Sequence, residues 1–114
     1  MMSRVDSLRN KIMKLAAKGK LDGLVKLSGD SDESVRTEVA IAMGQIRTYE
    51  SGMALIPLLR DSSPSVRAAA ATSAADIGAK HCEEYVKKLA FADADPNVRQ
   101  IAKNAFDRLK DRLV

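Results

Sequence analysis

Three stretches of this chain decide its fold: Asp32-Glu33-Ser34-Val35-Arg36, Ser63-Pro64-Ser65-Val66-Arg67 and Asp95-Pro96-Asn97-Val98-Arg99. Each begins with a polar residue and ends in Val-Arg, and the valines advance from 35 to 66 to 98, in steps of 31 and 32 residues. A fixed period of this length is typical of stacked helical repeats. The sequence therefore predicts a repeat protein with one structural unit for each copy of the pattern.

The residues after each valine predict a helix. Small or apolar side chains recur at offsets of 4, 7, 8 and 11 positions, which lie on one face of an α-helix; in the first copy they are Val39, Ala42, Met43 and Ile46. Three residues before each valine stand Asp32, Ser63 and Asp95, where a side-chain oxygen can accept from the first free backbone N–H groups. Pro64 and Pro96 follow at the first helical position, where the missing N–H costs nothing.

A shorter apolar segment precedes each of these helices, at residues 24–27, 55–59 and 86–90. Each unit is thus predicted to be a short helix, called A, a polar turn and a longer helix, called B. Residues 4–18 match the B pattern without a preceding A helix, and Gly19 closes this half repeat. We expect one domain over 1–114, made of an N-terminal half repeat (4–19), repeat 1 (20–48), repeat 2 (49–79) and repeat 3 with a C-terminal cap (80–114).

The order of helix A, Asp-containing turn, Val-Arg and Ala-rich helix B resembles the HEAT-like repeat, in the short form found in phycobilisome-lyase subunits, over roughly residues 20–110. The resemblance implies an all-α, right-handed α–α superhelix, armadillo-like, of about seven helices, with the B helices on the concave side. It also implies that the turn aspartates and the arginines of Val-Arg pair between neighbouring units. In this chain Arg36, Arg67 and Arg99 would then meet acceptors such as Asp30, Asp61 and Asp93, and these pairs are expected to be structural.

Composition indicates a soluble helical domain. Hydrophobic residues make up 46% and charged residues 30%, and no apolar run approaches the roughly 18 residues of a membrane span. The first residues show no signal-peptide pattern, and Cys82 is the only cysteine, so we expect a cytoplasmic protein without an intrachain disulfide. The net charge is +4, and all of this excess lies in residues 1–30, which carry seven Lys/Arg and three Asp/Glu.

The sequence offers little that predicts catalysis. His81 and Cys82 are adjacent and so cannot easily face one substrate atom, and one His with one Cys cannot form a zinc site without carboxylates. Glu83 and Glu84 diverge by about 100° on a helix. No phosphate-binding glycine loop and no hydrolase or metalloprotease motif occurs. We therefore expect a protein that is not an enzyme, with no catalytic residue, metal site or cofactor.

The predicted function is that of an interaction scaffold which binds a protein partner. The outward positions of the B helices fall at offsets 2, 6 and 10 from each valine and give a small, nearly neutral surface: Thr37, Ile41, Gln45, Ala68, Thr72, Asp76, Gln100, Asn104 and Arg108. Nucleic acid needs several cations along its contact, and this surface lacks them. The identity of the partner is not encoded in these residues.

Two alternatives stay open. The first is binding of nucleic acid or another acidic surface at the edge of the first helix, where Arg4, Lys11, Lys14 and Lys18 fall within an arc of about 80°. The second, implied only by the resemblance, is a subunit of a bilin-lyase-like modifying complex. A short solenoid also exposes its end units, so self-association or membership of a longer array is a further expectation.

Overall fold

The computed structural model describes residues 2–111 and contains seven α-helices and no strand over that range. Four helices match the predicted half repeat and B helices: α1 (Arg4–Ala17), α3 (Glu33–Met43), α5 (Pro64–Asp76) and α7 (Pro96–Lys110). Three match the A helices: α2 (Leu21–Leu27), α4 (Tyr49–Leu59) and α6 (Glu83–Ala92), the last preceded by the short 3₁₀ turn η1 (Lys80–Cys82). The all-α repeat architecture expected from the sequence is confirmed, and residues 112–114 of the expected C-terminal cap lie outside the described residues.

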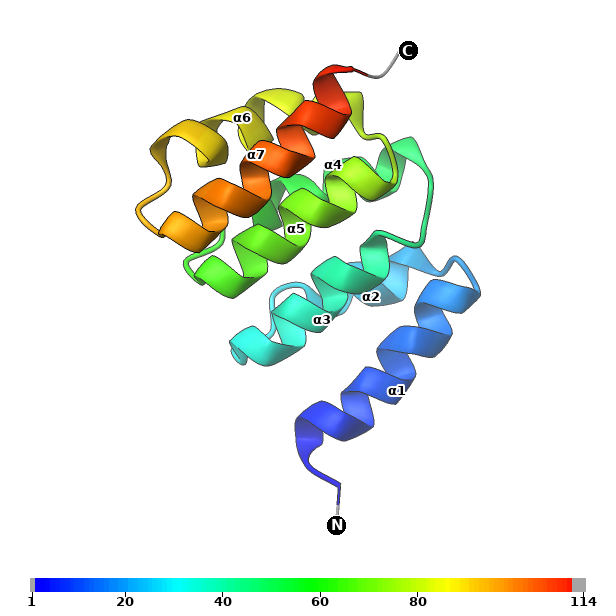
Figure 1. Cartoon of the computed structure of the whole chain (residues 1–114). Helices are drawn as coiled ribbons and strands as arrows, with labels where there is room; N and C mark the ends of the chain where they lie inside the picture. The colour runs from blue at the N-terminus through cyan, green and yellow to red at the C-terminus, as the bar shows by residue number, and fades with distance from the viewer. Residues whose placement is uncertain (1, 112–114) are drawn as a thin grey trace.

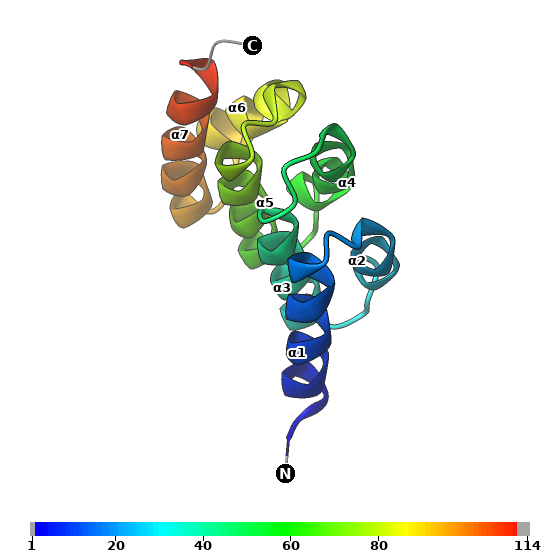
Figure 2. The same cartoon turned by 90° about the vertical axis from the view of Figure 1, so that its right-hand side faces the viewer.

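The helices form two layers. Figure 1 shows α1, α3, α5 and α7 side by side in one layer. In Figure 2 this layer is seen on edge, and α2, α4 and α6 form the second layer beside it. The B helices pack closely, α3 on α5 and α5 on α7, whereas α4 touches α6 much less. Close packing in one layer and looser packing in the other bends the stack, with the B helices on the inner side of the curve (Figure 2).

The repeated valines form the centre of the core. Val35, Val66 and Val98 are 0%, 0% and 1% exposed, each in the first turn of its own B helix. Equivalent positions in successive units thus have equivalent surroundings, as stacked repeats require. The register read from the three Val-Arg pairs is therefore the register of the fold.

Helix α5 owes its close contacts to alanine. Ala70, Ala71, Ala74 and Ala75 are all buried, so little side-chain volume separates α5 from its neighbours. In the last turn of this helix the buried Ser73 hydroxyl donates to the Ala40 carbonyl of α3 at 2.6 Å, which satisfies a hydroxyl that burial would otherwise leave unpaired.

Two glycines allow sharp chain reversals after B helices. Gly19 and Gly78 have φ of 66° and 65°, a left-handed conformation that costs glycine nothing. They follow α1 and α5, and each lets the chain turn at once into the next unit. None of the helices within residues 2–111 is both long and apolar enough to cross a lipid bilayer.

Candidate functional site

A ladder of ion pairs runs along the turns between A and B helices. Arg36 donates from Nε and Nη2 to the Asp61 carboxylate of the next unit, at 2.9 and 3.1 Å. One unit on, Arg67 makes the same two bonds to Asp93, at 2.8 and 3.0 Å. Both arginines also donate to the backbone carbonyl of the turn before their own helix, Arg36 to Asp30 and Arg67 to Asp61. Each arginine thus ties its own turn to the turn that follows.

The third arginine makes only half of this arrangement. Arg99 donates to the Asp93 carbonyl at 2.6 Å, and no carboxylate of a further unit meets it within the described residues. At the other end of the chain Arg4 pairs with the carboxylate of Asp30. The structure therefore places the aspartate partners of Arg36 and Arg67 one unit further along the chain.

Each ladder carboxylate is also fixed by its own turn. Asp30, Asp61 and Asp93 each accept from the backbone N–H two residues later, all at 2.9 Å. The hydrogen bond from Arg67 lowers the pKa of Asp93, with burial acting in the opposite direction and the Asp95 N–H reinforcing the decrease. Each of these carboxylates, held by a guanidinium and by a backbone N–H, links its turn to an arginine of the preceding unit.

The predicted helix caps form at two of three positions. Asp32 accepts from the Ser34 N–H at 2.8 Å, and Asp95 accepts from Asn97 and Val98. Ser63 occupies the same position, but its side chain makes no capping bond. Its hydroxyl is buried without a partner among the described residues, so the capping bond predicted there is wrong.

We call the nine predicted outward positions the B face; eight of them lie on α3, α5 and α7, and Gln45 lies in the turn after α3, which ends earlier than the sequence predicted. Ile41, Gln45, Thr72, Gln100, Asn104 and Arg108 are exposed, and Thr37, Ala68 and Asp76 are half-buried. Two members neutralise each other, since Arg108 pairs with Asp76 across α5 and α7 at 2.9 Å. Ile41, at 49% exposure, is the largest apolar side chain of the set. The B face is therefore nearly neutral, with one apolar anchor on α3.

The lysines of the first helix gather around a shallow depression. Lys11 and Lys14 of α1 line it together with Lys18 and Lys20, which follow the helix, and its volume is about 350 Å³. Arg4 does not join them, because its guanidinium pairs with Asp30. The structure thus brings three of the four predicted cations together and adds a fourth from the following turn. We call Lys11, Lys14, Lys18 and Lys20 the lysine cluster.

His81 and Cys82 lie where η1 meets α4. The Cys82 side chain is fully buried and its thiol donates to the Gly52 carbonyl at 3.2 Å, and burial raises its pKa to about 11. The His81 ring stacks on Tyr49 with 4.3 Å between ring centroids. A Cβ at Gly52 would collide with the imidazole, so a larger residue here would displace the His81 ring. The pair therefore fills space between helices, and its thiol is protonated at neutral pH.

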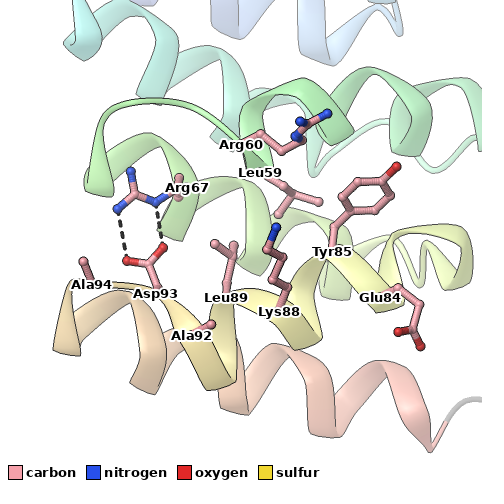
Figure 3. Close-up of a pocket in the computed structure, with 10 residues that line it drawn as sticks. All are labelled: Leu59, Arg60, Arg67, Glu84, Tyr85, Lys88, Leu89, Ala92, Asp93 and Ala94. Atoms are coloured by element: carbon pink, nitrogen blue, oxygen red, sulfur yellow. Dashed lines mark hydrogen bonds and ion pairs between the residues drawn. The ribbon is translucent and has the colours of Figure 1, made fainter.

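One depression was not predicted from the sequence. It has a volume of about 550 Å³ and lies on the A-helix side, between the end of α4 and the exposed flank of α6. Figure 3 shows its lining, with Leu59 and Leu89 at its base and Arg60, Tyr85 and Lys88 around them. We call it the α4–α6 groove. No pattern within α4 or α6 alone indicates it, because its two walls come from different units.

Comparisons with known proteins agree with this architecture. A family model for HEAT repeats matches residues 52–113. A deoxyhypusine hydroxylase of Arabidopsis thaliana is 34% identical over 107 residues, an alignment that covers 92% of this chain and 33% of that protein. The chain thus spans about a third of the length of this relative.

The match to a hydroxylase corrects one expectation. The sequence predicted a protein that is not an enzyme, whereas a relative that aligns with nearly the whole chain is named as one. The prediction failed because it searched for catalytic motifs inside a single chain, and a repeat scaffold can serve catalysis without containing one of these motifs. The match of the repeat model to more than half of the chain, together with the stacked helix pairs, shows that this protein belongs to the HEAT-repeat family.

Proposed function

We propose that this HEAT-repeat chain binds a protein partner in the cytoplasm through the B face. The observation that carries the proposal is the composition of this surface: small polar side chains around the exposed Ile41, on closely packed and rigid helices. Apolar anchors surrounded by polar side chains are typical of protein contacts. A binding role of this kind is compatible with participation in catalysis, which the similarity to a deoxyhypusine hydroxylase suggests.

The division of the chain supports the same proposal. We place the repeats at 20–48, 49–79 and 80–114 after the half repeat 4–19. Helices α5 and α7 each give three residues to the B face, and α3 gives two, with Gln45 in the turn that follows it. A partner that contacts all three helices would then bind side chains at the same offsets in successive units. This is how repeat proteins build extended binding surfaces.

Replacing Ile41 by arginine is expected to weaken binding of a B-face partner at least tenfold, because a charge would then occupy the position of the apolar anchor. The measurement is photo-crosslinking from a benzophenone side chain placed at Thr72, followed by titration of the captured protein against wild type and Ile41→Arg. Met53→Arg on α4 is the matched control, since Met53 has nearly the same exposure, 46% against 49%, and lies in the other layer. Equal loss in both variants, or crosslinks that persist in Ile41→Arg, would exclude the B face.

The lysine cluster supports a second candidate function, contact with an acidic surface. Four ammonium groups around one depression attract phosphates, and none of the four has an ion pair within the described residues. For a single-stranded oligonucleotide, four phosphate contacts give a slope of roughly −3 in log affinity against log salt concentration.

Fluorescence anisotropy with a labelled single-stranded oligonucleotide tests this candidate. A triple variant should show no binding at low ionic strength; it carries Lys11→Gln, Lys14→Gln and Lys18→Gln. Arg4→Gln should bind nearly as well as wild type, because Arg4 is paired with Asp30. If wild type shows no binding in low salt, or Arg4→Gln loses as much affinity as the triple variant, the lysine cluster is not a binding site.

A further inference from the structure

The α4–α6 groove combines an apolar base with cations. Leu59 of α4 and Leu89 of α6 form its base, and Ala92 extends it toward the following loop. Tyr85, 39% exposed, stands at one side of the groove (Figure 3). A volume of about 550 Å³ lies within the range of sites that hold a small ligand or a few residues of a peptide.

Two cations face this groove without a carboxylate to neutralise them. Arg60, at the end of α4, and Lys88 of α6 are exposed, and neither has an ion pair within residues 2–111. In Figure 3 the Lys88 ammonium is turned toward α4, whereas the Glu84 carboxylate is turned away from the groove. The remaining cation of the lining, Arg67, is already bound to Asp93. The groove therefore has an uncompensated positive charge.

The fold itself does not require these two cations. One unit earlier, the position that corresponds to Arg60 is Gly29. The position that corresponds to Lys88 is Pro57. The units stack without either charge at the earlier junction, so Arg60 and Lys88 are additions to the common scaffold rather than parts of it.

The geometry points to the α4–α6 groove as a binding site for an acidic peptide segment that carries an apolar side chain. The apolar side chain lies on Leu59 and Leu89 beside the Tyr85 ring, and a carboxylate of the peptide lies between Arg60 and Lys88. A nucleic acid fits less well, because two cations and one aromatic ring do not make the row of contacts that a phosphate backbone needs. The groove lies in the A layer, so this site is independent of the B face.

A random 12-residue peptide library displayed on phage, selected against the complete chain, tests this inference. Enriched peptides should carry Asp or Glu close to Leu, Ile, Met or Phe. Synthesised with a fluorescent label, they should bind Arg60→Gln/Lys88→Gln at least tenfold more weakly than wild type, and Tyr85→Ala more weakly as well. Exchanging their acidic residues for Asn or Gln should reduce binding to wild type to the same degree.

The matched control is Lys26→Gln/Lys103→Gln, which removes two exposed cations outside the groove and lowers the net charge equally. It should bind the peptides within twofold of wild type, and circular dichroism should show the helical content of wild type for every variant. Ile41→Arg should also keep full peptide binding, which separates failure of this inference from failure of the B-face proposal.

Three results would overturn the inference. The selection enriches no acidic peptides; the enriched peptides bind Arg60→Gln/Lys88→Gln as they bind wild type; or both cation variants lose affinity equally, so that only net charge matters. Analytical ultracentrifugation of wild type tests whether a second copy of the chain occupies the groove, which would also overturn the inference. If the chain dimerises and Arg60→Gln/Lys88→Gln is monomeric, the groove holds a second copy of the chain instead of a peptide.

Discussion

Replacing Arg67 by alanine is expected to lower the free energy of unfolding by about 2–4 kcal/mol, because it leaves the Asp93 carboxylate buried and without its cation. The Asp93 side chain is 4% exposed and that of Arg67 16%, so water cannot take over the lost contacts without rearrangement of the turn. The substitution also removes the hydrogen bond from Arg67 to the Asp61 carbonyl, so the turn at Asp61 loses one of its contacts as well. Urea unfolding followed by circular dichroism measures the change.

Arg99→Ala is the control that the repeat itself provides. Arg99 occupies the same position in its motif and makes the same carbonyl bond, but no carboxylate of a further unit faces it in the part of the chain that the structure describes. Its removal should cost about 1 kcal/mol, the contribution of an ordinary hydrogen bond. Equal losses in Arg67→Ala and Arg99→Ala would mean that the carboxylate pair adds nothing to stability.

The pH dependence of the Arg67→Ala effect follows from the lowered pKa of Asp93. A carboxyl group whose pKa is lower in the folded state stabilises the fold above its unfolded pKa of about 3.8, and this contribution is lost as the pH falls through the folded value. The gap in stability between wild type and Arg67→Ala should therefore narrow as the pH is lowered from 5 toward 2. A gap that stays constant over this range would assign the loss to packing alone.

Val66→Asp is expected to prevent stable folding, with a cost of more than about 4 kcal/mol. Val66 is fully buried in the first turn of α5, between the units on either side, and a carboxylate there has no partner. A loss of this size is comparable to the whole stability of a domain of this length, about 5–15 kcal/mol. The expected observation is the disappearance of the cooperative thermal transition.

Thr72→Asp is the control on the same helix. Thr72 is exposed on the B face, so the same side chain should cost less than about 1 kcal/mol there and leave a cooperative transition. If both variants lose the cooperative thermal transition, position 72 is not on the exposed face of α5. The contrast between the two substitutions therefore tests the register of the repeat directly.

The sequence predicted the parts of the fold that each unit carries within itself. The valine spacing set the register of the core, and Pro64 and Pro96 marked the starts of α5 and α7 because their effect is local to one turn. The rotamer of Ser63 was not predictable in this way. Its backbone position is that of a helix cap, but its hydroxyl is buried and makes no hydrogen bond among the described residues.

The candidate sites show the same division. The nine B-face positions follow from helical periodicity, and none of them is buried in the structure, although α3 ends before Gln45; their role in binding stays a prediction. The ion pair of Arg4 with Asp30 joins residues 26 positions apart and removes Arg4 from the predicted basic edge. The α4–α6 groove depends on how far two A helices stand apart, which is set by packing between the B helices beneath them.

One feature of the ladder bears on how freely this surface can change. The arginine and the turn carboxylate of each step in the ladder, and the buried valine beside them, lie away from the nine B-face positions, of which, among the described residues, only Asp76 and Arg108 pair with each other across two units. Substitution at the other seven positions leaves the ladder and the buried valines unchanged, so most of the proposed contact residues are separate from the residues that hold the units together. Randomising these surface residues in a library could therefore select binders of new targets while the residues between the repeats stay unchanged.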